Sequence, residues 1–207
     1  MIPARDEALV AALRAGDRDV LARLVRGWSN GMLRLAAAYV DDRAAAEEVV
    51  QDAWIAVLEG IDRFQGRAAL RTWVFRIVAN LARRRAARER RTVPLSALGG
   101  ADEPPVEPER FVAAGRALAG HWADPPRALT AEERLLAAET RARLLEAIRD
   151  LPPGQRAVIT LRDVDGWSAE DVCATLELTR ANQRVLLHRA RSSVRRALAP
   201  YLEEGGR

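Results

Sequence analysis

The stretch Ser168–Arg196, SAEDVCATLELTRANQRVLLHRARSSVRR, decides the fold of the carboxyl-terminal part of this 207-residue chain. A short helical pattern runs from Ser168 to about Leu176, and a turn at residues 177–179 separates it from a longer helical pattern. In each pattern the apolar residues recur at three- and four-residue steps, as on an amphipathic helix. A short helix, a tight turn and a second helix predict a helix-turn-helix motif.

The longer helix of this motif is strongly basic. Residues 179–196 hold six arginines and no acidic residue, although the net charge of the whole chain is only +4. The second helix of such a motif enters the major groove, where its first residues reach base edges and other cations hold phosphates. A solvated arginine face is the alternative interpretation. The residues predicted to contact duplex DNA are Thr179, Arg180, Asn182, Arg184, Val185, His188, Arg189 and Arg191, with Asn182, Arg184 and Val185 placed to read bases.

A second basic block, RRRAARERR, occupies residues 83–91, and the chain outside the two blocks is net acidic. An arginine- and aromatic-containing loop, FQGRAALR, lies before the helix that carries this block. Exposed rings beside arginines suit single-stranded DNA, because bases stack on the rings while the cations follow the backbone. Gly66 would let the loop bend around an unstacked base. The residues predicted here are Phe64, Arg67, Arg71, Trp73, Phe75, Arg76, Asn80, Arg83 and Arg84. Phe75 is expected off the core face. Trp73 also fits the core stripe, and a structural role is the default for a lone tryptophan there.

The rest of the chain has strong helical and almost no strand periodicity, which predicts an all-α fold. Six of the ten prolines fall between residues 92 and 129, where a continuous helix cannot form. The expected organisation is a helical bundle at 1–91, a long proline-rich linker at 92–129 with a short helix around 111–118, and a helix-turn-helix domain at 130–207. The amino-terminal bundle is expected to contain four helices. At the start of the carboxyl-terminal domain, Thr130 and Glu133 have the spacing of a capping box.

Several functional classes find no support in the sequence. No apolar run is long enough to span a bilayer, and the amino terminus lacks the shape of a secretory signal, so a cytoplasmic location without membrane insertion is expected. The single cysteine, Cys173, falls in an apolar stripe and is expected to be a small core residue. His121 and His188 stand in unrelated contexts, and no phosphate-cradling glycine loop is present. We therefore expect no metal, no cofactor and no catalytic residue.

Two segments resemble a known family. Residues 44–85, AAAEEVVQDAWIAVLEGIDRFQGRAALRTWVFRIVANLARRR, resemble the second conserved domain of bacterial sigma factors of the extracytoplasmic-function (ECF) group, within the sigma-70 family. Residues 151–198, which end in LLHRARSSVRRAL, are similar to the fourth domain of the same proteins. The third domain of larger sigma factors has no counterpart here, as is typical of this group.

The resemblance implies a promoter-specificity subunit that binds the RNA polymerase core (the beta and beta-prime subunits) and promoter DNA. The loop and helix from Phe64 to Arg84 would open and read the −10 element, and the helix from Thr179 would read the −35 element. An anti-sigma factor is expected as a partner by the same resemblance. Glu177, Gln183 and Leu186 depart from the family pattern, which usually has a glycine, an aliphatic residue and a basic residue at these places. The face expected to grip the clamp helices of the polymerase consists of Glu47, Glu48, Gln51 and Asp52.

Two other functions remain open at this point. A free-standing helix-turn-helix regulator would use the amino-terminal helices as a sensor domain, and a structural helical protein would bind no nucleic acid. The arginine- and aromatic-rich segment from Phe64 to Arg91 argues against the regulator, since a sensor domain would not need it. The two arginine blocks argue against a structural protein, which has no use for them.

Overall fold

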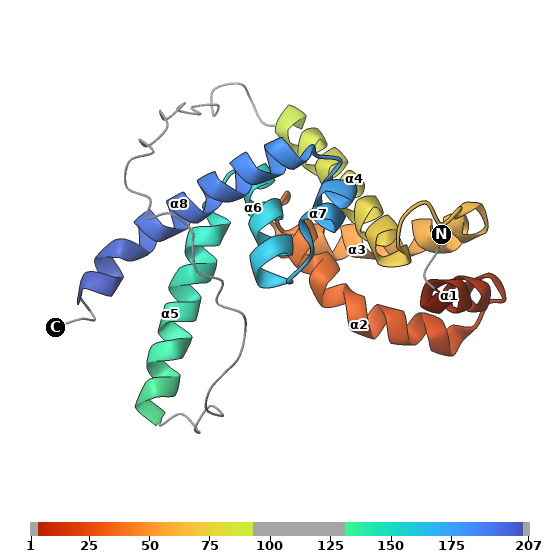
Figure 1. Cartoon of the computed structure of the whole chain (residues 1–207), viewed down its shortest axis with the longest axis horizontal. Coiled ribbons are helices and arrows are strands. Elements are labelled where there is room, and N and C mark those ends of the chain that lie inside the picture. The colour runs from red at the N-terminus through yellow and green to blue at the C-terminus, as the bar shows by residue number, and fades with distance from the viewer. Residues whose placement is uncertain (1–3, 93–130, 205–207) are drawn as a thin grey trace.

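The described chain, residues 4–92 and 131–204 of a computed structural model, consists of helices and short connections and contains no strand. The prediction of an all-α fold is therefore confirmed. The capping box predicted at Thr130 and the short helix predicted at 111–118 lie outside the described residues. The elements, shown in Figure 1, are α1 (Ala4–Arg14), α2 (Arg18–Ala36), α3 (Arg43–Gly60), η1 (Ile61–Arg63), α4 (Leu70–Thr92), α5 (Ala131–Arg149), α6 (Pro153–Ile159), a π-helical turn η4 (Thr160–Val164), α7 (Ala169–Leu176) and α8 (Arg180–Glu204).

Short polar side chains fix where the helices begin. The Asp17 carboxylate accepts hydrogen bonds from the backbone amides of Asp19 and Val20 at the start of α2. The Ser168 hydroxyl accepts from the amide of Asp171, and that of Thr179 accepts from the amide of Asn182. Each contact satisfies an amide that has no partner within its own helix.

The amino-terminal helices form one bundle. Helices α2, α3 and α4 pack against one another, and α1 crosses α2. Met32 of α2, Val57 of α3 and Val78 of α4 are fully buried at the centre. Helix α2 continues through Gly31, where an added β-carbon would lie 3.2 Å from the ring of Phe75. Gly31 therefore allows α2 and α4 to approach closely.

The carboxyl-terminal helices form a second packing unit. The buried residues Leu187, Ala190 and Val194 of α8 face α6 and α7, and they follow the three- and four-residue steps seen in the sequence. The far end of α8 packs on α5, where the hydroxyls of Thr140 and Tyr201 lie 3.2 Å apart.

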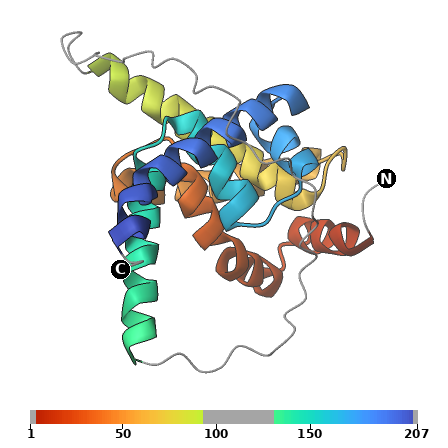
Figure 2. The ribbon, with the colours of Figure 1, turned by 60° about the vertical axis from the view of Figure 1, so that its left-hand side comes forward.

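The two units touch each other directly. Helix α7 packs along α4, and the π-helical turn η4 meets α2. Figures 1 and 2 both show α7 beside α4. The sequence, which suggested two domains on a tether, did not predict this contact.

The turn of the helix-turn-helix contains a strained residue. Glu177 caps α7 in the left-handed region, at φ 58° and ψ 45°, and its amide donates to the carbonyl of Cys173. A residue with a β-carbon pays roughly 1–2 kcal/mol for this conformation, whereas glycine does not. Glu177 thus takes a left-handed conformation at a place where the family pattern usually has a glycine.

We predict that Glu177→Gly stabilises the full chain by about 0.5–1 kcal/mol, because relief of the strain exceeds the extra unfolded-state entropy of glycine. The thermal midpoint should rise by a few degrees. Glu177→Ala removes the same carboxylate but keeps the β-carbon, so its midpoint should stay near that of the wild type. A fall in the midpoint of Glu177→Gly would contradict this explanation.

Candidate nucleic-acid interface

The first turns of α8 present an exposed face away from the domain core. Asn182, Arg184 and Val185 are all exposed there, and 46% of the Val185 surface is accessible although the side chain is apolar. Arg189 lies exposed one turn further along. The helix thus offers an amide, a guanidinium and a methyl surface at the end that a recognition helix inserts into the major groove.

Arg191 and Arg180, both predicted to contact DNA, are engaged within the domain. Arg191 donates two hydrogen bonds to the Asp163 carboxylate, at 2.7 and 2.8 Å, and these bonds raise the pKa of its guanidinium. Arg180 forms a longer ion pair with Glu170, at 3.5 Å. Arg191 therefore ties α8 to the end of η4, a role that the sequence did not suggest. Thr179 and His188 lie on the same exposed stretch of the motif.

Gln183 points inward, as the family pattern at its position implied. Only 3% of its surface is exposed, and its side-chain amide nitrogen has no hydrogen-bond partner among the described residues. Burying an amide group without a partner destabilises a fold by about 1–3 kcal/mol. This glutamine is therefore a weak point in the packing behind the exposed face of α8.

The loop between η1 and α4, residues 64–69, forms the wall of a pocket. Gly66 takes a positive φ of 67°, which lets the loop turn back toward α4. The pocket has a volume of about 190 Å³. Its lining residues are Arg63, Phe64, Gln65, Gly66, Arg67, Ala68, Trp73 and Arg76.

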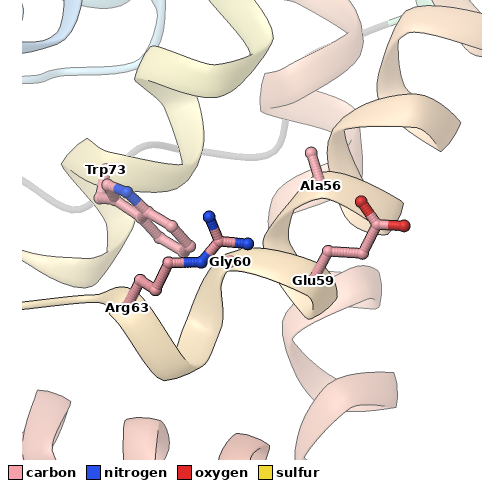
Figure 3. A pocket seen from close by; sticks show the side chains of 5 residues that line it. All are labelled: Ala56, Glu59, Gly60, Arg63 and Trp73. Atoms are coloured by element: carbon pink, nitrogen blue, oxygen red, sulfur yellow. The ribbon is translucent and has the colours of Figure 1, made fainter.

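A second pocket of about 330 Å³ adjoins the first on the side of α3 and shares Arg63 and Trp73 with it. Figure 3 shows the Arg63 side chain directed toward the Trp73 ring, while the Glu59 carboxylate points away from both. Trp73 fits the interface as well as the core, because the half-buried ring packs on Phe64 and also borders both pockets. Arg63 was missed by the sequence analysis, since a lone arginine near a helix end gives no distinctive pattern.

The expectation that Phe64 and Phe75 are exposed is wrong. Phe64 is 7% exposed and packs against Trp73 with ring centroids 5.1 Å apart. Phe75 is fully buried between Gly31 and Trp167, whose ring centroid lies 4.8 Å from its own. Phe75 does lie off the main stripe of α4, but the carboxyl-terminal unit covers that side of the helix.

Arg71 and Arg76 contact the carboxyl-terminal unit. The Arg71 guanidinium lies over the ring of Trp167, at 4.3 Å from the centroid. Burial lowers the pKa of Arg71, although Asp165 and Asp171 oppose this effect. Arg76 donates to the carbonyl of Ala174 on α7.

Further along α4, the predicted residues remain close to the helix. Arg83 donates to the side-chain oxygen of Asn80 and to the carbonyl of Ala79, and its guanidinium lies 6.0 Å from the ring centroid of Tyr39. Arg84 is exposed. These three predicted residues, Asn80, Arg83 and Arg84, therefore share one stretch of α4 beyond the contact with α7.

The acidic face of α3 is exposed as predicted. Glu47 pairs with Arg43 one turn earlier, and Glu48 accepts a hydrogen bond from Arg85 of α4 at 2.7 Å. Gln51 and Asp52 are exposed on the following turn. Two large apolar side chains, Ile55 and Leu58, extend this surface toward the end of α3, with 52% and 44% of their surfaces accessible. The face thus combines carboxylates with exposed apolar area.

Neither a metal site nor a membrane-spanning helix is found in the described part of the chain. Residues 4–92 and 131–204 contain no group of three or more histidine, cysteine or acidic side chains that could hold a metal ion. Among the same residues, no helix is both long and apolar enough to cross a bilayer. The half-buried Cys173 is a free thiol.

Comparison with known proteins identifies two matching family models. Sigma-70 region 2 matches residues 24–92, and Sigma-70 region 4 matches residues 141–194. The chain is 29% identical to the RNA polymerase sigma-H factor of Pseudomonas aeruginosa, over 97% of both chains. It is 28% identical to the ECF RNA polymerase sigma-E factor of Escherichia coli K12, over 95% of this chain and 96% of the relative.

Two solved structures share the fold. The structure of CnrH in complex with the cytosolic domain of CnrY aligns with a TM-score of 0.58 and 20% identity, over 94% of this chain and 97% of the other. The sigma factor RpoE in complex with the anti-sigma factor NepR, from Bartonella quintana, aligns with a TM-score of 0.54 and 20% identity, over 86% and 96%.

The chain belongs to the sigma-70 family and to its ECF group. It directs promoter-specific initiation of transcription by RNA polymerase, and the free-standing regulator is not favoured. Sigma factors are regulatory and not catalytic proteins.

We predict that Gln183→Met stabilises the full chain by about 1–2 kcal/mol, because it replaces a buried amide whose nitrogen lacks a partner with an apolar side chain of similar size. The thermal midpoint, followed by circular dichroism, should rise. Asn182→Met is the matched control, because the exposed amide of Asn182 loses no water on folding. A midpoint of Gln183→Met at or below that of the wild type would show that the buried amide is satisfied in solution.

Proposed function

We propose that each exposed surface described above has a separate task in initiation. Helix α8 reads the −35 element, the loop at 64–69 with the adjoining part of α4 opens and reads the −10 element, and the acidic face of α3 holds the polymerase core. The observation that carries this proposal is the pair of basic surfaces on two separate packing units, each accompanied by a suitable recognition element. The proposed boundaries are 1–91 for the −10 domain, 92–129 for the linker and 130–207 for the −35 domain.

The −35 assignment rests on the exposed face of α8. Arg184 can donate two parallel hydrogen bonds to guanine, and Asn182 can pair in the same way with adenine. Val185 supplies an apolar surface for a thymine methyl group. Arg189 and the basic residues further along α8 would then hold phosphates. These contacts would set the register of the helix on the DNA.

The −10 assignment rests on the loop and its pocket. A base that leaves the stack needs a recess with an aromatic wall and polar groups at its rim. The pocket at 64–69 offers Trp73 as the wall and two exposed arginines, Arg63 and Arg67, at the rim. Phe64 supports Trp73 from behind and does not face the base itself.

Simultaneous reading of both elements requires the two units to separate. The −10 and −35 elements are about 25 base pairs apart, which is about 85 Å along B-form DNA. In the structure, Arg76 of α4 lies 2.9 Å from the Ala174 carbonyl, shortly before α8 begins. Fully extended, residues 93–130 could span at most about 130 Å, so the covalent connection is long enough for the separation.

The contact between the units has features that favour its release. The Asp165 side chain is only 2% exposed, and it pairs with Arg34 of α2 through one oxygen. Its second oxygen and the Trp167 indole nitrogen are buried without a hydrogen-bond partner among the described residues. These polar groups lose their hydration without gaining a hydrogen bond, so their burial costs free energy. Opening of the contact would expose them to water and remove this cost.

The polymerase assignment rests on the face of α3 defined by Glu47, Glu48, Gln51 and Asp52. Carboxylates at the rim with the exposed Ile55 and Leu58 beside them form a surface suited to a basic, partly apolar helical partner. We propose that this partner is the clamp-helix region of the core. We further propose that the protein acts in the cytoplasm, catalyses no reaction and is held by an anti-sigma factor, as RpoE is by NepR.

We predict that Arg184→Ala in the holoenzyme reduces initiation at a promoter with an intact −35 element by about 1–3 kcal/mol, or roughly 5- to 150-fold. The promoter would first be identified by sequencing transcript starts after overexpression. On a template with a scrambled −35 element, the variant and the wild type should be equally weak. Arg23→Ala, which removes an exposed arginine of α2, is the matched control and should leave initiation unchanged.

The same experiment can contradict the proposal in two ways. If the wild-type chain fails to form a complex with purified core polymerase on gel filtration, it does not act as a sigma factor. If Arg184→Ala keeps full preference for the intact −35 element, α8 does not read this element through Arg184.

A further inference from the structure

Helix α1 holds both ends of the loop at residues 64–69, although it lies outside the segments that match the family. Arg14, its last residue, donates to the carbonyls of Ile61, Asp62 and Phe64 at 3.3, 3.2 and 2.9 Å. These carbonyls belong to η1 and to the first residue of the loop.

The other end of the loop is held by the opposite end of α1. An oxygen of the Asp6 carboxylate accepts a hydrogen bond of 2.8 Å from the amide of Leu70, the first residue of α4. This amide is among those that have no partner within their own helix, so Asp6 caps α4 from outside it. The carboxylate also lies at the positive end of the dipole of α4.

The contact made by Arg14 and the contact made by Asp6 lie at a fixed distance from each other, because both residues belong to α1. Asp6 and Arg14 are eight residues apart on one helix, which corresponds to a span of about 12 Å. Val10 and Leu13, on the intervening turns, are buried against the bundle and fix the position of α1. The loop between the two contacts carries Gly66 and Arg67 and forms the wall of the pocket.

We propose that Arg14 and Asp6 are positioning residues for recognition of the −10 element: together they hold the loop at 64–69 in the shape that accepts an unstacked base. This inference rests on the proposed function of the loop. Neither side chain lines the pocket, so both act through the loop backbone. Arginine suits the first position because its planar fork can serve several carbonyls at once, which a lysine ammonium cannot do in the same geometry.

The test uses holoenzymes assembled from the full chain and a promoter library in which the −10 and −35 positions are both randomised. Transcripts are sequenced, and a base-preference profile is obtained for each element. For Arg14→Ala and for Asp6→Ala we expect the ratio between preferred and disfavoured bases in the −10 element to fall at least about threefold, whereas the −35 profile stays unchanged.

Two matched variants separate positioning from general instability. Asp6→Asn keeps an oxygen acceptor for the Leu70 amide, so it should retain more of the −10 preference than Asp6→Ala. Arg18→Ala removes an exposed arginine close to α1 and should leave both profiles intact. A chain that is merely less stable would lose signal equally at both elements, and its base preferences would not change.

An unchanged −10 profile in both alanine variants would overturn the inference, and so would an equal flattening of both profiles. If the wild-type library shows no preference at either element, the proposed function fails first. If the wild type shows two clear profiles and the variants have the same profiles, the inference about Arg14 and Asp6 fails and the proposed function stands.

Discussion

The arrangement of the two packing units depends on one aromatic and cationic cluster between them. Trp167 is 5% exposed and packs its ring against Phe75, while the Arg71 guanidinium covers its face. The contact joins a residue just before α7 to the outer side of α4. Because α4 also supplies the core of the amino-terminal bundle through Val74 and Val78, this one helix links the stability of the bundle to the position of the other unit.

The same cluster decides which of the proposed DNA-binding residues are exposed while the two units are in contact. Arg71 and Arg76 of the proposed −10 surface are occupied by the unit that carries α8, whereas Arg67 and the reading face of α8 remain exposed. Interfaces between domains of one chain resemble transient interfaces and commonly permit relative motion. A buried carboxylate with one orphaned oxygen weakens this contact further, because an unpaired polar atom regains water when the interface opens. In our account, binding to polymerase and promoter therefore competes with an internal contact of modest stability.

Much of the local structure was predictable from the sequence. Helix periodicity and the turn at residues 177–179 predicted the helix-turn-helix, because these signals act within a few residues. The family resemblance marked Glu177 and Gln183 as departures from a usual glycine and a usual aliphatic residue, and the structure has a left-handed turn and a buried side chain there. Contacts between distant segments leave no comparable periodic signal. Phe75 appeared exposed because its cover, Trp167, comes from the other unit, and the partners of Arg14 lie more than forty residues away.

The separation of the two units during initiation is the step on which the proposed function depends. It is tested most directly by energy transfer between dyes on the two units, attached at Arg18→Cys and Ala197→Cys in a Cys173→Ala background, since Cys173 is the only native cysteine. Both labelled positions are exposed. We expect transfer to fall clearly between the free chain and the complex with core polymerase and promoter DNA, where the reading surfaces lie about 85 Å apart. Equal transfer in the free chain and in the promoter complex would contradict it.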